Sequence, residues 1–375
     1  MKSLNRRQFN STFSKGLGSA MILGNVPLAC ALGAEPKKNK KLGIALVGLG
    51  LYSTYELAPS LQETEFCELK AIVTGTPEKE QLWAEKYGIP QSNIYNYQNF
   101  DAIAENDEID IVYVVLPNAM HADFSIRAAK AGKHVICEKP MAVSVAECEA
   151  IIEACDKAGV KLGVGYRLHS EPHTQEIQRI VREKEYGKVN YISAEAGYLS
   201  RGNWDQWRFN NVLSGGGALM NMGVYAIQGL IYGTGENPVS VRAQQFSTMP
   251  QFFKDTDETI TAQFEFASGA VGNLFTSHNA KGDRLYASCE KGWYELDVAY
   301  TYGPLHGRTS TGQEISYPHR RQQGLQMDDF ARHILEDLPN KVPGEMGLRD
   351  LKIVEAIYTS IAQGGKRIPL KLSFV

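Results

Sequence analysis

A glycine-rich turn near the start of the chain has the residue types and spacing of a phosphate-binding loop. Gly48-Leu49-Gly50 ends an apolar run, and Ser53 follows three residues later, which gives the pattern Gly-x-Gly-x-x-Ser. Glycines allow the backbone to turn sharply and approach a pyrophosphate, whose negative charge then lies at the positive N-terminus of the next helix. Ser53 replaces the usual third glycine or alanine and is small enough for the helix to pack against the strand. The motif predicts a dinucleotide site, and a purely structural turn is the alternative.

The residues after the second predicted strand bear on which dinucleotide is bound. An NAD-binding enzyme usually places Asp or Glu at this strand end, where the carboxylate binds the ribose 2′-hydroxyl. Here Val73 is followed by Thr74, and Lys79 stands at the start of the next helix. Because a hydroxyl and an ammonium group can bind a 2′-phosphate, we predict NADP, with NAD as the less favoured alternative. Lys79 could equally be a solvated helix residue, and the neighbouring Glu78 weakens the argument.

Alternating strands and helices are needed to position this loop. The apolar run Leu42–Val47 is continuous, which is typical of a strand buried on both faces of a parallel sheet. The alternation predicts an α/β fold, a Rossmann domain with a doubly wound parallel sheet, over residues 40–165. The other strands are expected at 69–73, 109–116, 134–137 and 161–165, and the helices at 77–87, 100–105, 122–131 and 144–158.

The sequence pattern changes after about residue 185. Segments there alternate apolar with polar residues, and Ser268-Gly269 and Lys291-Gly292 stand where hairpin turns are expected. We therefore expect a C-terminal α+β domain over residues 166–375, with an open, mostly antiparallel sheet that helices cover on one face. Since an open sheet face usually meets a partner, we expect a homodimer or homotetramer through that face. The strands are expected at 189–196, 239–246, 258–266, 270–277, 284–290 and 292–297, and the last helices at 325–338 and 348–362.

Residues 1–34 have the pattern of an export signal. Arg6-Arg7 precede an apolar stretch rich in small residues, as in a twin-arginine signal, so we expect a periplasmic or otherwise exported protein. The stretch is too short and too interrupted for a comfortable membrane span. Leu28-Ala29-Cys30 weakly resembles a lipoprotein box, which leaves a lipid anchor at Cys30 open. A disordered or amphipathic N-terminal helix is the other alternative.

The composition excludes several classes of protein. A hydrophobic content of 43% and a charged content of 22% are those of a globular chain, and a net charge of −3 gives no basic surface for nucleic acid. The six cysteines lack paired Cys-x-x-Cys spacing, which argues against a metal site and against a disulfide framework. We therefore expect no metal and no nucleic-acid partner.

Two segments that follow later strands carry a family resemblance. Leu116-Pro117-Asn118-Ala119-Met120-His121 comes after one strand, and Cys137-Glu138-Lys139-Pro140 comes after the next. A Glu-Lys-Pro triplet at this place resembles the glucose-fructose oxidoreductase / inositol dehydrogenase (Gfo/Idh/MocA) superfamily, and the resemblance covers nearly the whole chain after the signal. It implies hydride transfer to and from a sugar or polyol, in the manner of the glucose-fructose oxidoreductases, which are periplasmic and hold NADP tightly. Further matching segments are Gly165-Tyr166-Arg167-x-His169, Gln206-Trp207-Arg208, Gly215–Met220 and Gly223-x-Tyr225.

The resemblance implies a role for each matched residue. Lys139 would lie near the nicotinamide, and Tyr225, one helical turn after Asn221, would exchange the proton of the sugar hydroxyl. A free phenol with a pKa of about 10 is a weak base, and a nearby ammonium group stabilises the phenolate. Glu138 would orient Lys139 or the cofactor. The implied cofactor contacts are Gly48, Leu49, Gly50, Tyr52, Ser53, Thr74, Lys79, Leu116, Pro117, Asn118, His121, Glu138, Lys139 and Arg167, and the implied substrate contacts are Asn221, Arg167, Trp207 and Arg208.

Asn221 departs from the pattern of the family, because relatives usually carry Asp at this position. An asparagine exchanges hydrogen bonds with sugar hydroxyls but cannot take a proton. Either Tyr225 carries the proton chemistry alone or the substrate differs from glucose. The linker before Leu42 is also shorter than the N-terminal arm of the glucose-fructose oxidoreductases. Retention of the cofactor by such an arm, and the tetramer that the arm ties together, therefore stay open.

Each assignment also has a purely structural alternative. Lys139 could be a surface lysine at a strand end, Tyr225 a core aromatic residue, and His121 a residue that packs or caps its own helix. His169 and His173 flank a loop and could be sugar ligands. Two other functions also fit: an exported glycosidase that oxidises C3 transiently with bound NAD, and a non-catalytic dinucleotide sensor.

Overall fold

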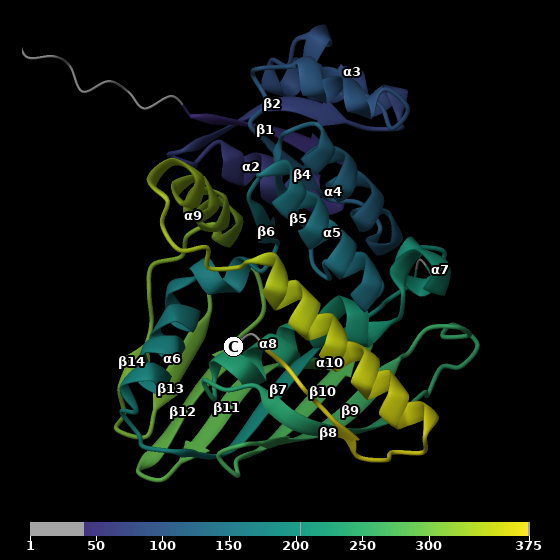
Figure 1. The fold of residues 1–375 in the computed structure, drawn as a ribbon. Coiled ribbons are helices and arrows are strands. Elements are labelled where there is room, and N and C mark those ends of the chain that lie inside the picture. The colour runs from purple at the N-terminus through teal and green to yellow at the C-terminus, as the bar shows by residue number, and fades with distance from the viewer. Residues whose placement is uncertain (1–40, 203, 374–375) are drawn as a thin grey trace, which may run out of the picture. The chain divides into compact units, whose positions relative to one another are not determined.

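The computed structural model describes residues 41–202 and 204–373 of the 375-residue chain. The export signal expected over residues 1–34, with the alternative lipid anchor at Cys30, lies outside the described residues and stays a prediction. Within the described part of the chain, no helix is both long enough and apolar enough to cross a membrane. The elements form two sheets with helices packed on them (Figure 1).

The first sheet confirms the predicted Rossmann architecture. All its paired strands are parallel, and their order is β3-β2-β1-β4-β5-β6. Successive residues of β1 face opposite sides: Ala45 and Val47 pack in one apolar cluster, and Ile44 and Leu46 pack in another. This burial on both faces explains the continuous apolar run in the sequence. The strands are β1 (Leu42–Val47), β2 (Cys67–Val73), β3 (Ile94–Tyr95), β4 (Ile111–Val114), β5 (His134–Cys137) and β6 (Leu162–Val164).

Helices cover both faces of this sheet. On one face, α4 (His121–Lys130) and α5 (Val145–Ala158) contribute side chains to the first cluster. On the other face lie α2 (Ala58–Leu61), α3 (Pro77–Tyr87) and α9 (Gln322–Glu336), although α9 comes from the last part of the chain. The helix expected over residues 100–105 is a 3₁₀ segment, η3. The predicted division of the chain at residue 165 stays a prediction. One helix that packs on the first sheet, α9, comes from the chain after that residue.

The second sheet is mostly antiparallel, as predicted, with one exception. Its order is β14-β13-β12-β11-β7-β10-β9-β8-β15, and β7 and β10 run parallel. The chain leaves β7 through helices and returns through the antiparallel strands β8, β9 and β10, so that β10 enters beside β7 in the same direction. The strands are β7 (Val189–Leu199), β8 (Pro238–Phe246), β9 (Thr259–Phe266), β10 (Val271–Ser277), β11 (Asn279–Cys289), β12 (Gly292–Val298), β13 (His306–Thr309), β14 (Glu314–Ile315) and β15 (Ile368–Pro369).

Helices pack on one face of the second sheet (Figure 1). They are α6 (Pro172–Glu183), α8 (Val224–Tyr232) and α10 (Gly344–Ala362), and every residue of α8 is buried. Along β7 the buried Ile192 and Ala194 alternate with the half-buried Tyr191, Ser193 and Glu195. No helix of the described residues covers the face that carries the latter set, which keeps the predicted oligomer through this face a prediction.

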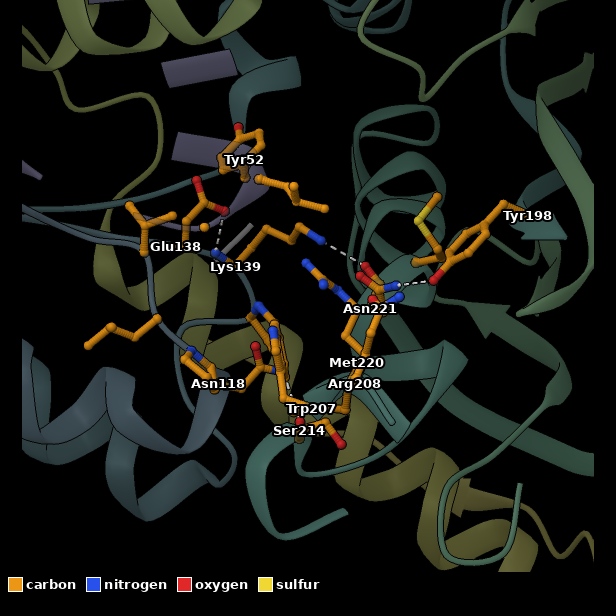
Figure 2. A pocket seen from close by; sticks show the side chains of 18 of the residues that line it. Tyr52, Asn118, Glu138, Lys139, Tyr198, Trp207, Arg208, Ser214, Met220 and Asn221 are labelled. Carbon is orange, nitrogen blue, oxygen red and sulfur yellow. Dashed lines mark hydrogen bonds between the residues drawn. The ribbon is translucent and has the colours of Figure 1, made fainter. Parts of the chain in front are cut away.

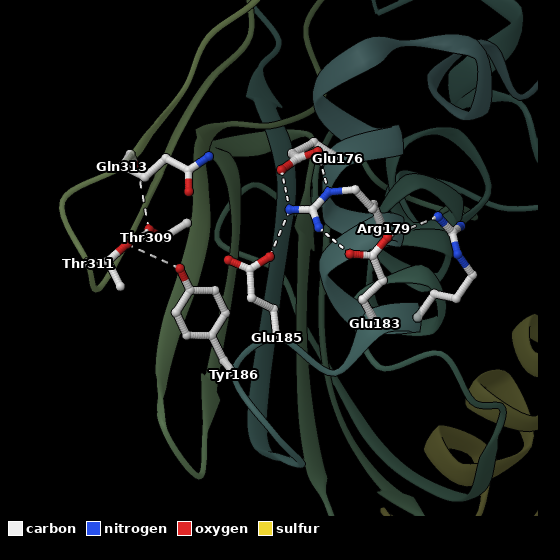
Figure 3. A network of polar contacts seen from close by, with 9 residues as sticks. Glu176, Arg179, Glu183, Glu185, Tyr186, Thr309, Thr311 and Gln313 are labelled. Atoms are coloured by element: carbon white, nitrogen blue, oxygen red, sulfur yellow. Dashed lines mark hydrogen bonds and ion pairs between the residues drawn. The ribbon is translucent and has the colours of Figure 1, made fainter. Parts of the chain in front are cut away.

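A surface ion cluster holds the end of α6. The guanidinium of Arg179 lies 2.8 Å from Glu176, 2.5 Å from Glu183 and 2.8 Å from Glu185, so three carboxylates surround one cation (Figure 3). The side chain of Arg179 is one-third exposed. These contacts join the last turns of α6 to the segment that leads into β7.

Candidate active site

A single large cavity collects nearly all the residues that sequence reasoning selected. Its volume is about 1090 Å³, and it lies at the carboxyl ends of β1, β2, β4 and β5, where residues that follow these strands meet β7, β11 and the start of α8. Ligands of doubly wound sheets bind at this edge, where the strand order reverses between β1 and β4. The selected residues that line it are Gly48, Leu49, Gly50, Tyr52, Thr74, Lys79, Leu116, Pro117, Asn118, His121, Glu138, Lys139, Arg167, Trp207, Arg208, Asn221 and Tyr225.

The glycine-rich turn fits a diphosphate. Gly48 has a φ of +95°, and a Cβ there would lie 2.5 Å from the carbonyl oxygen of Val115, so only glycine fits. At Gly50 a Cβ would meet no atom within 4 Å, which leaves the position open toward the cavity. Ser53 is buried and does not line the cavity; its hydroxyl donates to the carbonyl of Gly48 at 2.6 Å. The serine therefore stabilises the turn from the side that faces away from the cavity.

The end of the cavity beyond this turn carries hydroxyl and ammonium groups. The ammonium of Lys79 donates to the carbonyl of Leu49 at 2.8 Å, so this half-buried lysine reaches back to the glycine-rich turn. Thr74 is buried, and its hydroxyl oxygen accepts from the backbone N–H of Thr76 at 3.2 Å. Thr74, Thr76, Lys79 and Tyr97 line this end, and no carboxylate stands among them. Such a donor set fits the ribose and 2′-phosphate of NADP.

Lys139 and Tyr225 converge in the same cavity from two different elements. Lys139 follows β5 and Tyr225 lies on α8, and the Lys139 Nζ lies 4.6 Å from the centre of the Tyr225 ring. The same ammonium donates to the backbone carbonyl of Asn221 at 2.8 Å (Figure 2). Burial lowers the pKa of Lys139, and the nearby Tyr225 and Glu138 partly oppose that shift. Tyr225 is only 6% exposed but lines the cavity, so its ring is available to a ligand.

Glu138 lies beneath this pair. Its carboxylate accepts from the hydroxyl of Tyr113 at 2.7 Å and from the backbone N–H of Lys139 at 3.1 Å. Burial raises the pKa of Glu138, while Lys139 and Tyr113 act in the opposite direction. A Cβ at Gly165 would lie 2.6 Å from this carboxylate, which explains the glycine there. Glu138 therefore orients the backbone at Lys139 and leaves the ammonium group free to face Tyr225.

Arg167 forms part of the wall of the cavity. Its guanidinium lies 5.0 Å from the centre of the Tyr225 ring and 4.6 Å from that of Tyr302, and it donates to the carbonyl of Thr301 at 3.0 Å. The Tyr302 ring in turn stacks on Tyr52 with centres 6.0 Å apart. Arg167 thus donates hydrogen bonds to the backbone. It also packs against a row of aromatic rings that joins the glycine-rich turn to the loop after β12.

Asn118 and His121 tie the walls of the cavity together. The Asn118 amide donates to the carbonyl of Ser214 at 2.8 Å, across the two parts of the fold (Figure 2). The buried ring of His121 lies with its two nitrogens 2.9 Å from the carbonyls of Pro140 and Leu116. Burial lowers the pKa of His121. Both residues line the cavity, and a neutral His121 donates to one of its two carbonyls while the other nitrogen lies within contact distance of the second.

The two other histidines of the sequence analysis lie outside this cavity. The Nε2 of the buried His169 lies 2.5 Å from the amide oxygen of Gln228, and the Nδ1 of His173 lies 2.6 Å from the carboxylate of Glu171. Burial lowers the pKa of His169 to about 4. Neither histidine contacts the cavity, so the alternative that they bind the sugar is wrong for a sugar in this site.

Sequence reasoning missed several residues that line the cavity. They come from loops and strand ends that carry no motif, so only the fold brings them to the site. The one signal was a run of aromatic residues beside glycine and proline, Tyr300-Thr301-Tyr302-Gly303-Pro304, which is typical of a loop shaped for a ligand. The missed lining residues include Tyr97, Tyr198, Arg201, Lys281, Asp283, Tyr300 and Tyr302. Among residues 41–202 and 204–373, no group of three or more His, Cys, Asp or Glu side chains could hold a metal ion.

Comparison with known families gives two matches that together cover more than half of the chain. The model of the GFO/IDH/MocA oxidoreductase family with an NAD-binding Rossmann fold matches residues 42–166. The model of the GFO/IDH/MocA C-terminal domain matches residues 174–295. The two matches fall on the two sheets, in the order that the structure has them.

Individual relatives are sugar oxidoreductases. The crystal structure of the aldose–aldose oxidoreductase from Caulobacter crescentus, complexed with glycerol, has a TM-score of 0.85 and 39% identity, over 88% of this chain and 100% of that one. The D-xylose 1-dehydrogenase [NADP(+)] of Haloarcula marismortui is 28% identical over 84% of this chain and 89% of its own length. The D-xylose 1-dehydrogenase (NADP(+)) 2 of Haloferax volcanii is 26% identical over 86% and 97%.

Proposed function

Because the chain belongs to the GFO/IDH/MocA oxidoreductase family, an oxidoreductase family that binds nicotinamide dinucleotides, we propose that it moves hydride to and from an aldose with NADP as a retained cofactor. The observation that carries the proposal is the convergence of Lys139 and Tyr225 in a cavity that begins at the glycine-rich turn. Acceptance of a second aldose as oxidant would return the cofactor to its starting state. The relative from Caulobacter crescentus, named an aldose–aldose oxidoreductase, supports this coupling.

We propose that Tyr225 and Lys139 carry the proton chemistry and that the backbone carbonyl of Asn221 orients Lys139. When bound, the dinucleotide supplies a nicotinamide ring that exchanges hydride with the carbinol carbon of the sugar. The Tyr225 phenol takes the hydroxyl proton during oxidation and returns it during reduction. The Lys139 ammonium, 4.6 Å from the ring centre, stabilises the phenolate in a cavity of low dielectric. The backbone carbonyl of Asn221 orients that ammonium by accepting a hydrogen bond from it at 2.8 Å.

The preference for NADP rests on the ribose end of the cavity. A carboxylate there would repel a 2′-phosphate, and none lines this end in the described residues. Lys79 brings a positive charge to the same place, where Thr74 and Thr76 add hydroxyl groups. Two relatives named as NADP(+)-dependent dehydrogenases agree with the choice. NAD is the less favoured alternative.

Retention of the cofactor is proposed from the aromatic row over the cavity. Tyr52 from the Rossmann part stacks on Tyr302 from the other part, and Arg167 holds Tyr302 from below. We propose that this row closes over a bound dinucleotide and thereby slows its release. A retained cofactor suits a protein exported through a twin-arginine signal at residues 1–34, because such a protein leaves the cytoplasmic dinucleotide pool. We further propose a homodimer or homotetramer through the open face of the second sheet.

The purified protein provides the test. Denaturation should release NADP in nearly equal amount to the protein, identified by its mass and by enzymatic cycling. Addition of excess aldose to the native protein should produce absorbance at 340 nm once per site, and a second aldose should remove it. Protein that contains no dinucleotide and turns over only with added cofactor would contradict retention. Cleavage of nitrophenyl glycosides without net reduction would instead support a glycosidase with transient C3 oxidation.

A further inference from the structure

The side-chain amide of Asn221 has both of its hydrogens engaged. Its Nδ2 donates to the hydroxyl of Tyr198 at 3.2 Å (Figure 2). The same Nδ2 lies 2.9 Å from the Nε2 of His278. An amide nitrogen has two hydrogens, so these two contacts use its whole donor capacity. The carbonyl oxygen Oδ1 makes no hydrogen bond to the described residues, and Asn221 lines the cavity. Oδ1 is therefore the one polar atom of this side chain that is left for a ligand.

His278 can accept this hydrogen bond because its ring is neutral. The residue is 0% exposed, and burial, with Arg208 and Lys139 nearby, lowers its pKa to about 3. A neutral imidazole has one acceptor nitrogen, so an Nε2 that accepts requires the proton on Nδ1. The Nδ1 is a buried atom without a hydrogen-bond partner among the described residues. Native proteins seldom leave such a group unpaired, and where they do the group often serves a function.

Aromatic rings hold the imidazole in place. The ring of His278 lies 5.1 Å from that of Tyr198, 5.6 Å from Phe209 and 6.4 Å from Phe253, measured between centres. Packing of this kind restricts rotation of the histidine without competing for its nitrogens. The acceptor that faces Asn221 is thus fixed in direction.

We infer that His278 and Tyr198 are positioning residues that lock the amide of Asn221 with its Oδ1 toward the cavity, where it accepts a hydrogen bond from a sugar hydroxyl next to the one that Tyr225 deprotonates. The inference rests on the proposed function. Asn221 lies in the π-helical segment η7 (Leu219–Gly223), four residues before Tyr225 on α8, and both residues line the cavity. The site thereby keeps the acceptor that a carboxylate would supply, without a group that takes up a proton. A sugar that lacks the hydroxyl loses this contact.

A measurement of the histidine proton tests the inference without turnover. Protein labelled with ¹⁵N-histidine is compared with the same label in His278→Gln, which identifies the resonances of His278. We expect a neutral ring with the proton on Nδ1 and no titration between pH 5 and pH 9. A proton on Nε2 would donate to Asn221 and turn its amide around, and a charged ring at pH 6 could not accept; either result overturns the inference.

Substrate discrimination provides the second test. One of the monodeoxy glucoses should lose about tenfold in kcat/KM relative to glucose in the wild-type protein, as expected for one hydrogen bond. In His278→Ala this discrimination should shrink to about twofold, and His278→Gln, whose amide oxygen replaces Nε2, should restore it. Tyr198→Phe, which removes one acceptor with little change of shape, should have an intermediate value. His306→Gln, at an exposed histidine of β13, is the matched control.

Full discrimination in His278→Ala would overturn the inference while leaving the proposed function intact. Loss of the wild-type circular dichroism spectrum in that variant would mark a failure to fold, and the discrimination measured in Tyr198→Phe then decides. If no sugar reduces the cofactor in the wild-type protein, the proposed function fails, and the position of the histidine proton alone decides the inference.

Discussion

Two groups of cations in this molecule have opposite surroundings. On the surface, Arg179 is enclosed by the carboxylates of three glutamates within 2.8 Å (Figure 3). In the cavity, Lys139 faces a carbonyl and the ring of Tyr225, and the guanidinium of Arg208 lies 4.5 Å from the centre of the Trp207 ring. Neither cavity cation forms an ion pair with a carboxylate of the described residues. The surface charges neutralise one another, whereas the cavity keeps its positive potential for groups that bind there.

This contrast separates structural from functional charge. An exposed ion pair is screened by water and contributes little to stability. Lys139 and Arg208 are half-buried, so each is less well hydrated than a surface cation and its field is less screened by water. An unpaired cation of this kind is useful where negative charge develops during a reaction, as on the Tyr225 oxygen. The predictions below test the contrast from its strongest expected effect to its weakest.

Replacement of Tyr225 should break the cavity chemistry most completely. Tyr225→Phe keeps the ring and its contacts with Lys139 and Arg167 but removes the hydroxyl that exchanges the proton. Turnover should fall by about 10²–10⁴-fold, the usual contribution of a general acid–base group. Steady-state kinetics with an aldose measures the loss, and dinucleotide content should stay at the wild-type level. Near-normal turnover would remove Tyr225 from the mechanism.

Loss of the Lys139 ammonium should be the next largest effect. Lys139→Met removes the positive charge beside the phenol, so we expect turnover to fall by about 10²–10³-fold. Lys139→Arg keeps the charge and should retain more activity than Lys139→Met. Equal activity in the two variants would argue against an electrostatic role.

Two buried histidines should make stability depend on pH. The pKa of His169 is lowered to about 4 and that of His278 to about 3, against about 6.5 in the unfolded chain. Between pH 6.5 and pH 4 the unfolded state therefore binds protons that the folded state does not, and stability falls as the pH falls. Each histidine should contribute about 1.4 kcal/mol per pH unit. Urea unfolding at several pH values should show a smaller slope for His169→Gln, and an unchanged slope would contradict the prediction.

The cofactor preference should depend on Lys79. Lys79→Ala removes the ammonium that reaches the glycine-rich turn, so the Kd for NADP should rise by about tenfold while the Kd for NAD changes little. Lys86→Ala, on the exposed side of the same helix, is the matched control. Fluorescence titration of protein stripped of its dinucleotide gives both constants. Equal losses for NADP and NAD would place Lys79 away from the 2′-phosphate.

The surface cluster should respond least. Arg179→Gln breaks three ion pairs, yet the free energy of unfolding should change by at most about 1 kcal/mol, because the group is partly exposed and its pairs are screened. Turnover should be unchanged. Chemical denaturation at low and high salt checks the first expectation, since screening should reduce the effect. A large loss of turnover would show that this cluster contributes to the active site, which contradicts the difference between the two groups of cations.

The sequence predicted the features that depend on local pattern. The glycine spacing, the strand that precedes it and the Glu138-Lys139-Pro140 segment after β5 were all readable, because strand-helix alternation fixes which ends meet at one edge of a parallel sheet. Tyr198 and His278 could not be predicted from the sequence, and the aromatic run that contains Tyr302 was the only signal for that residue. They stand in a loop and in or beside strands without motifs, and only the pairing of β7 with β11 and the turn after β10 bring them to Asn221 and Arg167.

The same limit applies to the fold. A helix was expected over residues 325–338 within the second domain. The observed helix, α9 (Gln322–Glu336), packs its apolar residues on the first sheet, and no local pattern states which sheet an amphipathic helix will cover. The parallel pair β7–β10 follows from the path of the chain through α8, which periodicity does not record. Patterns therefore predicted the elements, and their long-range partners required the structure.

Single-turnover reduction tests the central claim most directly. The protein as purified is mixed anaerobically with glucose or with glucose deuterated at every carbon, and absorbance is followed at 340 nm. If Lys139 and Tyr225 act together on a sugar beside bound NADP, absorbance should rise once per site, more slowly with the deuterated sugar, and at least about a hundredfold more slowly in Tyr225→Phe. Bound NADP that no aldose reduces, or a Tyr225→Phe variant as fast as wild type, would contradict the account.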